Sequence, residues 1–144
     1  RNRISSLIVG AFHTAGQLRW AAPEPYPYID RLEEVKSDDA DALRKQLDEA
    51  IRANDQARAC AIVHRYGDLS LPVRPLLDLL LKYAVSEDGA LHAEKFYQTV
   101  TEEYATTRAA FRSRQFIALA RVTASEHGFP APGIQQASEL LKLS

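Results

Sequence analysis

The sequence of 144 residues contains one cysteine, Cys60, and no methionine. A single cysteine excludes an internal disulfide and any metal site built from cysteines alone. A reducing compartment is the simplest setting for such a chain, so we expect a cytoplasmic protein. The chain opens with Arg1 and lacks a starting methionine, which is consistent with a segment of a longer polypeptide.

An excess of one charge and a long apolar run are missing as well. The 18 basic and 19 acidic residues give a formal net charge of -1, which argues against a nucleic-acid partner. No apolar run approaches the ~20 residues that a membrane span requires. The hydrophobic fraction of 46% and the charged fraction of 26% are typical of a globular domain. A chain of this length can bury a core without a disulfide or metal, so we expect one domain over 1–144.

Strict alternation of apolar and polar residues, the pattern of a strand, is also absent, and apolar residues recur every three or four positions instead. Prolines interrupt this periodicity and predict a Pro-rich connector over 22–36. The sequence therefore predicts an all-α fold, an irregular bundle of six or seven helices. The expected helices cover 4–18, 38–52, 56–66, 72–85, 90–106, 107–127 and 134–142.

Local signals predict the ends of several helices. Ser37 is the expected N-cap of the second helix, and Asn54-Asp55 that of the third, which Gly67 is expected to end. Within the second helix, Asp48 and Arg52 are spaced to form an ion pair. The helix over 72–85 is apolar nearly all round, so we expect it to be central. The expected core residues are Leu77, Leu80, Leu81, Phe96, Val100, Phe111, Leu119 and Val122.

The candidates for chemistry are histidines and nearby acids, because phosphate loops, paired-cysteine zinc spacings and di-iron Glu-x-x-His spacings are absent. His64 falls on the same helix face as Cys60, and the two could supply two metal ligands. The alternative is an ordinary buried imidazole bonded to a carbonyl. His92 follows Glu87 and Asp88 by five and four residues, which suits a metal site or a proton-transfer group. Helix capping with a surface hydrogen bond explains the same spacing.

Other polar and aromatic residues have simpler explanations beside a functional one. His13 suits solvent or contact with another part of a longer protein, and His127 suits the negative end of a helix dipole. The rings of Trp20, Tyr26 and Tyr28 predict either a groove for a ligand or a peptide, or a clamp that holds the connector to the core. The arginines form either an anion site or a solvated face: Arg108, Arg112, Arg114 and Arg121.

The stretch from Tyr83 to His92, with its acidic pair before a histidine, resembles a motif in a helical domain of bacterial Rieske-type and questin-oxidase-like proteins. Two further stretches are similar to parts of that domain: Ala120-Arg121-Val122 with Ala124 and His127, and Ala11-Phe12 with Ala15 and Leu18. The resemblance implies a helical, metal-dependent domain near redox chemistry. A Rieske cluster itself needs two cysteines, and this chain has one.

The leading hypothesis is a metal-binding helical domain with a redox or oxygenase role. His92 and His64 would be ligands, and Asp88, Glu87 or Glu103 would complete the site. Histidine with carboxylate favours non-haem iron, although zinc or manganese would also fit. A redox protein or the remainder of a longer chain would be the partner. The alternative is a non-catalytic helical protein–protein interaction module, which scattered histidines would favour.

Overall fold

The computed structural model describes residues 2–17, 28–86, 91–129 and 133–142, and in these ranges all regular secondary structure is helical. The prediction of an all-α fold is confirmed, with one more helix than expected because a 3-10 helix, η1, occupies part of the connector. The elements are α1 (Asn2–Gln17), η1 (Ile29–Glu34), α2 (Ala40–Arg52), α3 (Gln56–Asp68), α4 (Val73–Ala84), α5 (Leu91–Thr106), α6 (Ala109–Glu126) and α7 (Ile134–Leu141).

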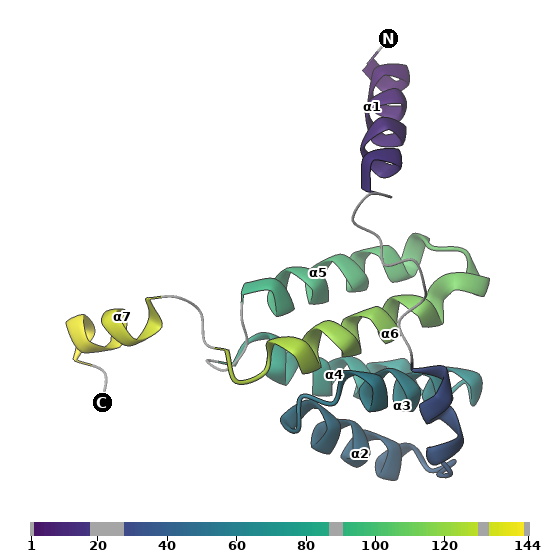
Figure 1. The fold of residues 1–144 in the computed structure, drawn as a ribbon, viewed down its shortest axis with the longest axis vertical. Coiled ribbons are helices and arrows are strands. Elements are labelled where there is room, and N and C mark those ends of the chain that lie inside the picture. The colour runs from purple at the N-terminus through teal and green to yellow at the C-terminus, as the bar shows by residue number, and fades with distance from the viewer. Residues whose placement is uncertain (1, 18–27, 87–90, 130–132, 143–144) are drawn as a thin grey trace.

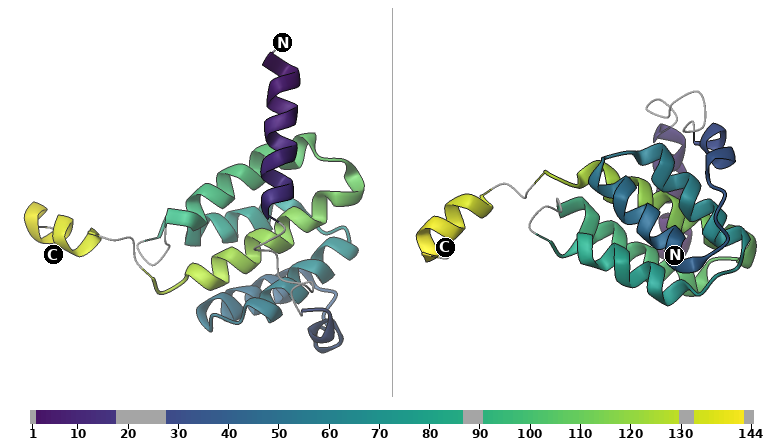
Figure 2. Two further views of the ribbon diagram at one scale, coloured as in Figure 1. Left: turned by 45° about the horizontal axis from the view of Figure 1, so that its top comes forward. Right: turned by 90° about the horizontal axis from the view of Figure 1, so that it is seen from below.

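The packed body consists of η1 and α2–α6, with the antiparallel pair α3 and α6 at its centre (Figures 1 and 2). At one end, Asn54 Nδ2 donates to the carbonyls of Ala124 at 3.0 Å and His127 at 2.7 Å. At the other end, Gly67 of α3 lies against Ser113 of α6. The expectation that 72–85 is central is wrong, because α4 contacts α2, α5 and α6 and packs at the side of this pair.

The core prediction is confirmed for three residues and wrong for two. Leu80, Val100 and Leu119 are buried. Phe96 and Phe111 are each 43% exposed, Phe96 beside a cleft and Phe111 under the guanidinium of Arg114. Aromatic rings satisfy helical periodicity equally well at the edge of a core, so the pattern overestimates their burial. The remaining predicted residues are half-buried: Leu77, Leu81 and Val122.

The caps of α2 and α3 are aspartates. Asp55 caps α3 as predicted, since its carboxylate accepts from Arg58 N at 3.0 Å. The N-cap of α2 is Asp39 and not Ser37, because the Asp39 carboxylate accepts from Ala42 N at 2.7 Å. An ionised carboxylate interacts more strongly than a hydroxyl with the positive end of a helix.

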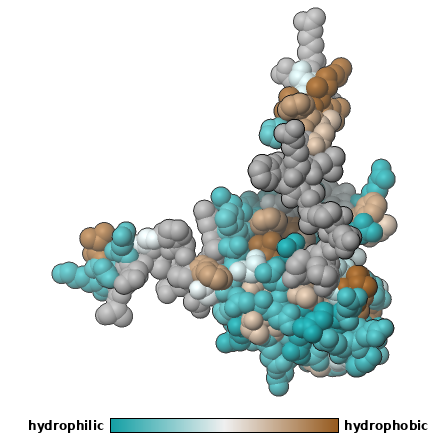
Figure 3. All heavy atoms as spheres, in the orientation of Figure 1, coloured by the Kyte–Doolittle hydropathy of each residue, from teal (hydrophilic) through white to brown (hydrophobic). Residues whose placement is uncertain are grey.

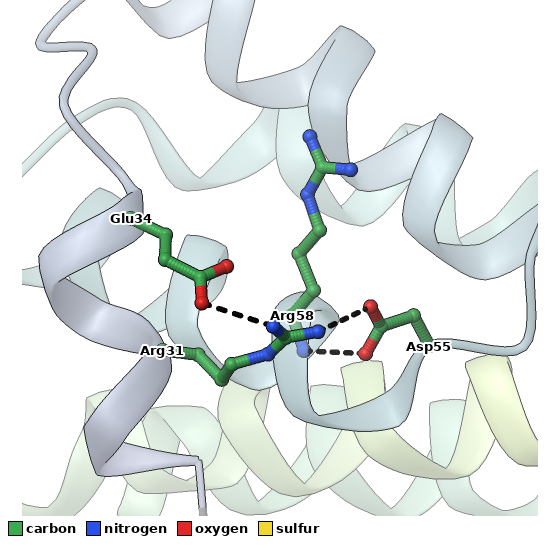
Figure 4. A network of polar contacts seen from close by, with 4 residues as sticks. All are labelled: Arg31, Glu34, Asp55 and Arg58. Carbon is green, nitrogen blue, oxygen red and sulfur yellow. Dashed lines mark hydrogen bonds and ion pairs between the residues drawn. The ribbon is translucent and has the colours of Figure 1, made fainter.

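The described part of the predicted connector, residues 28–36, carries η1. Residues 22–27 of the predicted connector lie outside the described residues. Arg31 holds η1 in place by pairing with Glu34 at 2.9 Å and with Asp55 at 3.0 Å (Figure 4). Asp55 thus caps α3 and anchors η1 at once, which fixes Tyr28, just before η1, next to α3.

Asp48 is the centre of a polar network between α2 and α4. It accepts from Tyr83 Oη at 2.6 Å, from Arg52 Nε at 2.8 Å, as predicted for that pair, and from Lys82 Nζ at 3.2 Å. Burial disfavours ionisation of Asp48, but these hydrogen bonds outweigh it and lower the pKa of Asp48 to about 2. Burial and the bond to Asp48 raise the pKa of Tyr83 to about 12.

We expect Asp48→Asn to lower the free energy of unfolding at pH 7 by about 1–2 kcal/mol. The folded pKa lies below the usual value of 3.8, so the ionised carboxylate stabilises the fold above about pH 4. The difference between wild type and variant should shrink as the pH falls from 4 towards 2. Urea unfolding at several pH values measures it, with the exposed Asp30→Asn as control. A difference that does not depend on pH would contradict the network.

Candidate functional site

A cleft of about 600 Å³ opens on the surface of α6, between α3, α5 and Tyr28. Most of its lining comes from one face of α6, where the positions recur every three or four residues as helix geometry requires. The lining residues are Tyr28, Gln56, Cys60, Phe96, Arg114, Ile117, Ala118, Arg121, Val122 and Ser125.

Helix α6 buries one face in the core and presents another face to the cleft. The buried face carries Phe116, Leu119, Ala120, Thr123 and Ala124. The face that lines the cleft combines apolar with polar and charged side chains: Arg114, Ile117, Ala118, Arg121, Val122 and Ser125. Ile117 also packs against the core, whereas Ala118 is exposed. The cleft therefore presents apolar surface together with charged groups.

The cleft has arginines in its lining and no acidic residue. Arg114 and Arg121 lie seven residues apart on the same face of α6. The Arg121 guanidinium donates through Nε to Gln56 Oε1 at 3.3 Å. The cleft thus combines an apolar floor with positive charge, which suits a ligand that is both apolar and anionic.

Cys60 lies at the bottom of the cleft as a protonated thiol. Its sulfur is buried and donates to the Ile117 carbonyl at 3.7 Å. Burial raises the pKa of the Cys60 thiol to about 11, and the charge of Arg121 only partly opposes this. Since the thiolate is the reactive and metal-binding form, Cys60 acts here as a small apolar residue at neutral pH.

His64 lies one turn beyond Cys60 and packs against the connector. Its ring contacts Tyr28 with centroids 5.7 Å apart, and its Nε2 lies 3.4 Å from Asp68 Oδ2. The described residues thus connect the predicted aromatic segment to the cleft, because Tyr28 contacts His64 and also lines the cleft. Trp20 and Tyr26 lie outside the described residues.

The structure does not bring the other predicted metal ligands to His64. His92 is 68% exposed at the start of α5, with Nδ1 3.7 Å from Glu126 Oε2 at the end of α6. His64 lies beside the first half of α6, because α3 and α6 are antiparallel. Glu103 is exposed on α5, 11 residues and roughly 16 Å of helix rise beyond His92.

Glu87 and Asp88, the acidic pair of the predicted metal site, lie outside the described residues. Among the residues that the structure does describe, no group of three or more His, Cys, Asp or Glu side chains could hold a metal ion. Glu126 is a carboxylate beside His92 that sequence spacing did not find, because it comes from another helix. A metal at His92, with Glu87 and Asp88, stays a prediction.

Comparisons with known proteins add no relative: no family model, no curated protein and no solved structure matches this chain. The resemblance to the helical domain of Rieske-type and questin-oxidase-like proteins therefore stays a prediction too. The geometry of the cleft is the observation from which a function can be argued.

Proposed function

We propose that this chain is a helical protein–protein interaction module whose recognition surface is the cleft on α6. The observation that carries the proposal is the apolar surface exposed in the cleft. Phe96 of α5 and Ala118 of α6 are exposed there, beside the half-buried Ile117 and Val122. Contiguous apolar surface of this kind marks binding sites in soluble domains more often than scattered single residues do.

The charge of the cleft indicates the chemistry of the partner. Arg114 and Arg121 lie among apolar side chains in the lining of the cleft. A short amphipathic helix with apolar residues three or four positions apart, and with acidic residues beside them, would complement both properties. Charge-assisted hydrogen bonds from the guanidinium groups would then orient the segment along α6.

The lining supports binding more than catalysis. It contains no histidine and no carboxylate to transfer a proton, and the thiol of Cys60 is held protonated by burial. The hydroxyl of Ser125 donates to the Val122 carbonyl at 2.8 Å, and no base in the lining activates it or the Tyr28 hydroxyl. Its volume lies within the range of pockets that take a few side chains or a small ligand. The described groups can hold and orient a partner without changing it.

The test is a displayed library of random helical peptides, selected against the full chain. We expect the selected sequences to share apolar residues at helical spacing together with Asp or Glu. Ala118→Arg, in the cleft, should weaken binding of a selected peptide by at least about ten-fold, because the long side chain fills an apolar surface. Ala110→Arg is the matched control, since Ala110 is exposed on the same helix outside the cleft.

Two results would contradict the proposal. One is selection of the same peptides by wild type and by Ala118→Arg. The other is that the chain selects no peptide but binds a small apolar carboxylate such as dodecanoate in the cleft. The cleft would then be a small-molecule site. Arg114→Gln separates charge from shape: it should reduce affinity for acidic peptides and the salt dependence of binding.

A further inference from the structure

Helix α1 carries a large apolar face that this molecule leaves uncovered. Five large side chains are more than half exposed on it, up to 79% for Phe12: Ile4, Leu7, Ile8, Val9 and Phe12. Helix α1 contacts none of the other described elements, and its hydrophobic side chains stand out in the space-filling view (Figure 3). Leaving so many apolar groups in water is unfavourable, so this face needs a partner surface.

Four of these five residues form one continuous face of α1, and Val9 lies beside it. At 100° per residue, the arc from Leu7 through Ile4 and Ile8 to Phe12 covers about 140° of the helix. Gly10 and His13 fall outside this arc. Such a two-faced helix is typical of helices that lie in the interface between a bilayer and water.

The charge of this end of the chain indicates which surface α1 fits. Residues 1–23 contain three arginines and no acidic residue, whereas residues 24–144 contain 15 basic and 19 acidic residues. The arginine-lined cleft on α6 offers no carboxylate to this segment, so the cleft and α1 are poor partners for each other. An anionic surface complements both the apolar face and the positive charge.

The length of α1 decides how it would meet a bilayer. Its 16 residues rise about 24 Å, less than the roughly 30 Å of a hydrocarbon core. In the part of the chain that the structure describes, no helix combines the length and the apolar character of a membrane span. Insertion in the plane of the interface is the geometry that buries the apolar face and leaves the polar face in water.

We propose that α1 binds the surface of anionic lipid bilayers, with Ile4, Leu7, Ile8 and Phe12 inserted among the headgroups. This proposal is independent of the peptide-binding role of the α6 cleft, because α1 shares no contact with the cleft. The body of the domain would then be tethered to the membrane with its cleft still available.

The experiment is flotation of the full chain with vesicles. We expect binding to vesicles of mixed phosphatidylcholine and phosphatidylglycerol, and at least about ten-fold weaker partitioning to phosphatidylcholine alone or at high salt. The double variant Ile8→Gln, Phe12→Gln should reduce partitioning to mixed vesicles by at least about ten-fold. His13→Gln is the matched control on the polar face and should change it less than about two-fold.

The chain also supplies its own spectroscopic reporter. Trp20 is the single tryptophan and follows α1 by three residues, so its emission should shift to shorter wavelength when mixed vesicles are added. The double variant should unfold at the same temperature as wild type, because α1 makes no contact with the packed body. This separates loss of binding from loss of folding.

Three results would overturn the proposal. Wild type could fail to float with mixed vesicles, or the double variant could float as well as wild type. The third is a loss of vesicle binding in His13→Gln as large as the loss in the double variant. A concentration-dependent dimer that the double variant abolishes, without vesicle binding, would instead assign the apolar face of α1 to a second copy of the chain. None of these results depends on whether the α6 cleft binds a peptide.

Discussion

Replacing Leu80 with alanine is expected to lower the free energy of unfolding by about 2–5 kcal/mol. Leu80 is fully buried in α4, where the helix packs against its neighbours in the body. The substitution removes three carbon atoms and leaves a cavity that the surrounding side chains fill only in part. Chemical denaturation, followed by the helical signal in circular dichroism, measures the change.

The matched control is Leu140→Ala, the same substitution in α7. Leu140 is 84% exposed and α7 contacts none of the other described elements. We expect this control to change the free energy of unfolding by less than about 0.5 kcal/mol, as is usual at surface sites. A loss below about 0.5 kcal/mol for Leu80→Ala as well would show that α4 does not pack as the structure has it.

The positions of the helices could be predicted from the sequence because the signals are local. Periodicity and the Asp55 cap depend on residues a few positions apart, and α3 begins where that cap predicts. Local signals do not say which face of a helix meets which neighbour. Phe111 is apolar at a suitable spacing, yet it lies at the start of α6 under Arg114 and stays exposed.

The candidate site was harder to predict, because it is formed between elements. Val122 has the spacing of a core residue but lies at the edge of the face of α6 that lines the cleft, and only the packing of α3 and α5 decides which face becomes a cleft. In the same way, Glu126 meets His92 through folding alone, since 34 residues separate them.

Gly67 shows how one residue can be interpreted in two ways. Glycine near the end of a helical pattern predicts a stop, but α3 continues through Gly67 to Asp68. A Cβ atom added at Gly67 would lie 3.2 Å from Ser113 Cβ, closer than ordinary contact. Gly67 is therefore a point of close approach between α3 and α6, the two helices at the centre of the body.

We expect Gly67→Leu to lower the free energy of unfolding by about 1–3 kcal/mol, because a large side chain forces α3 and α6 apart. Gly67→Ala should change it by less than about 0.5 kcal/mol, since the gain in helix propensity offsets one tight contact. Chemical denaturation of both variants measures the difference, with Gly10→Leu as control. An added Cβ at Gly10 meets nothing within 4 Å, so this control should leave the stability of the body unchanged. Equal stability of Gly67→Leu and wild type would mean that α3 and α6 are further apart at this point, and that Gly67 has no role in their packing.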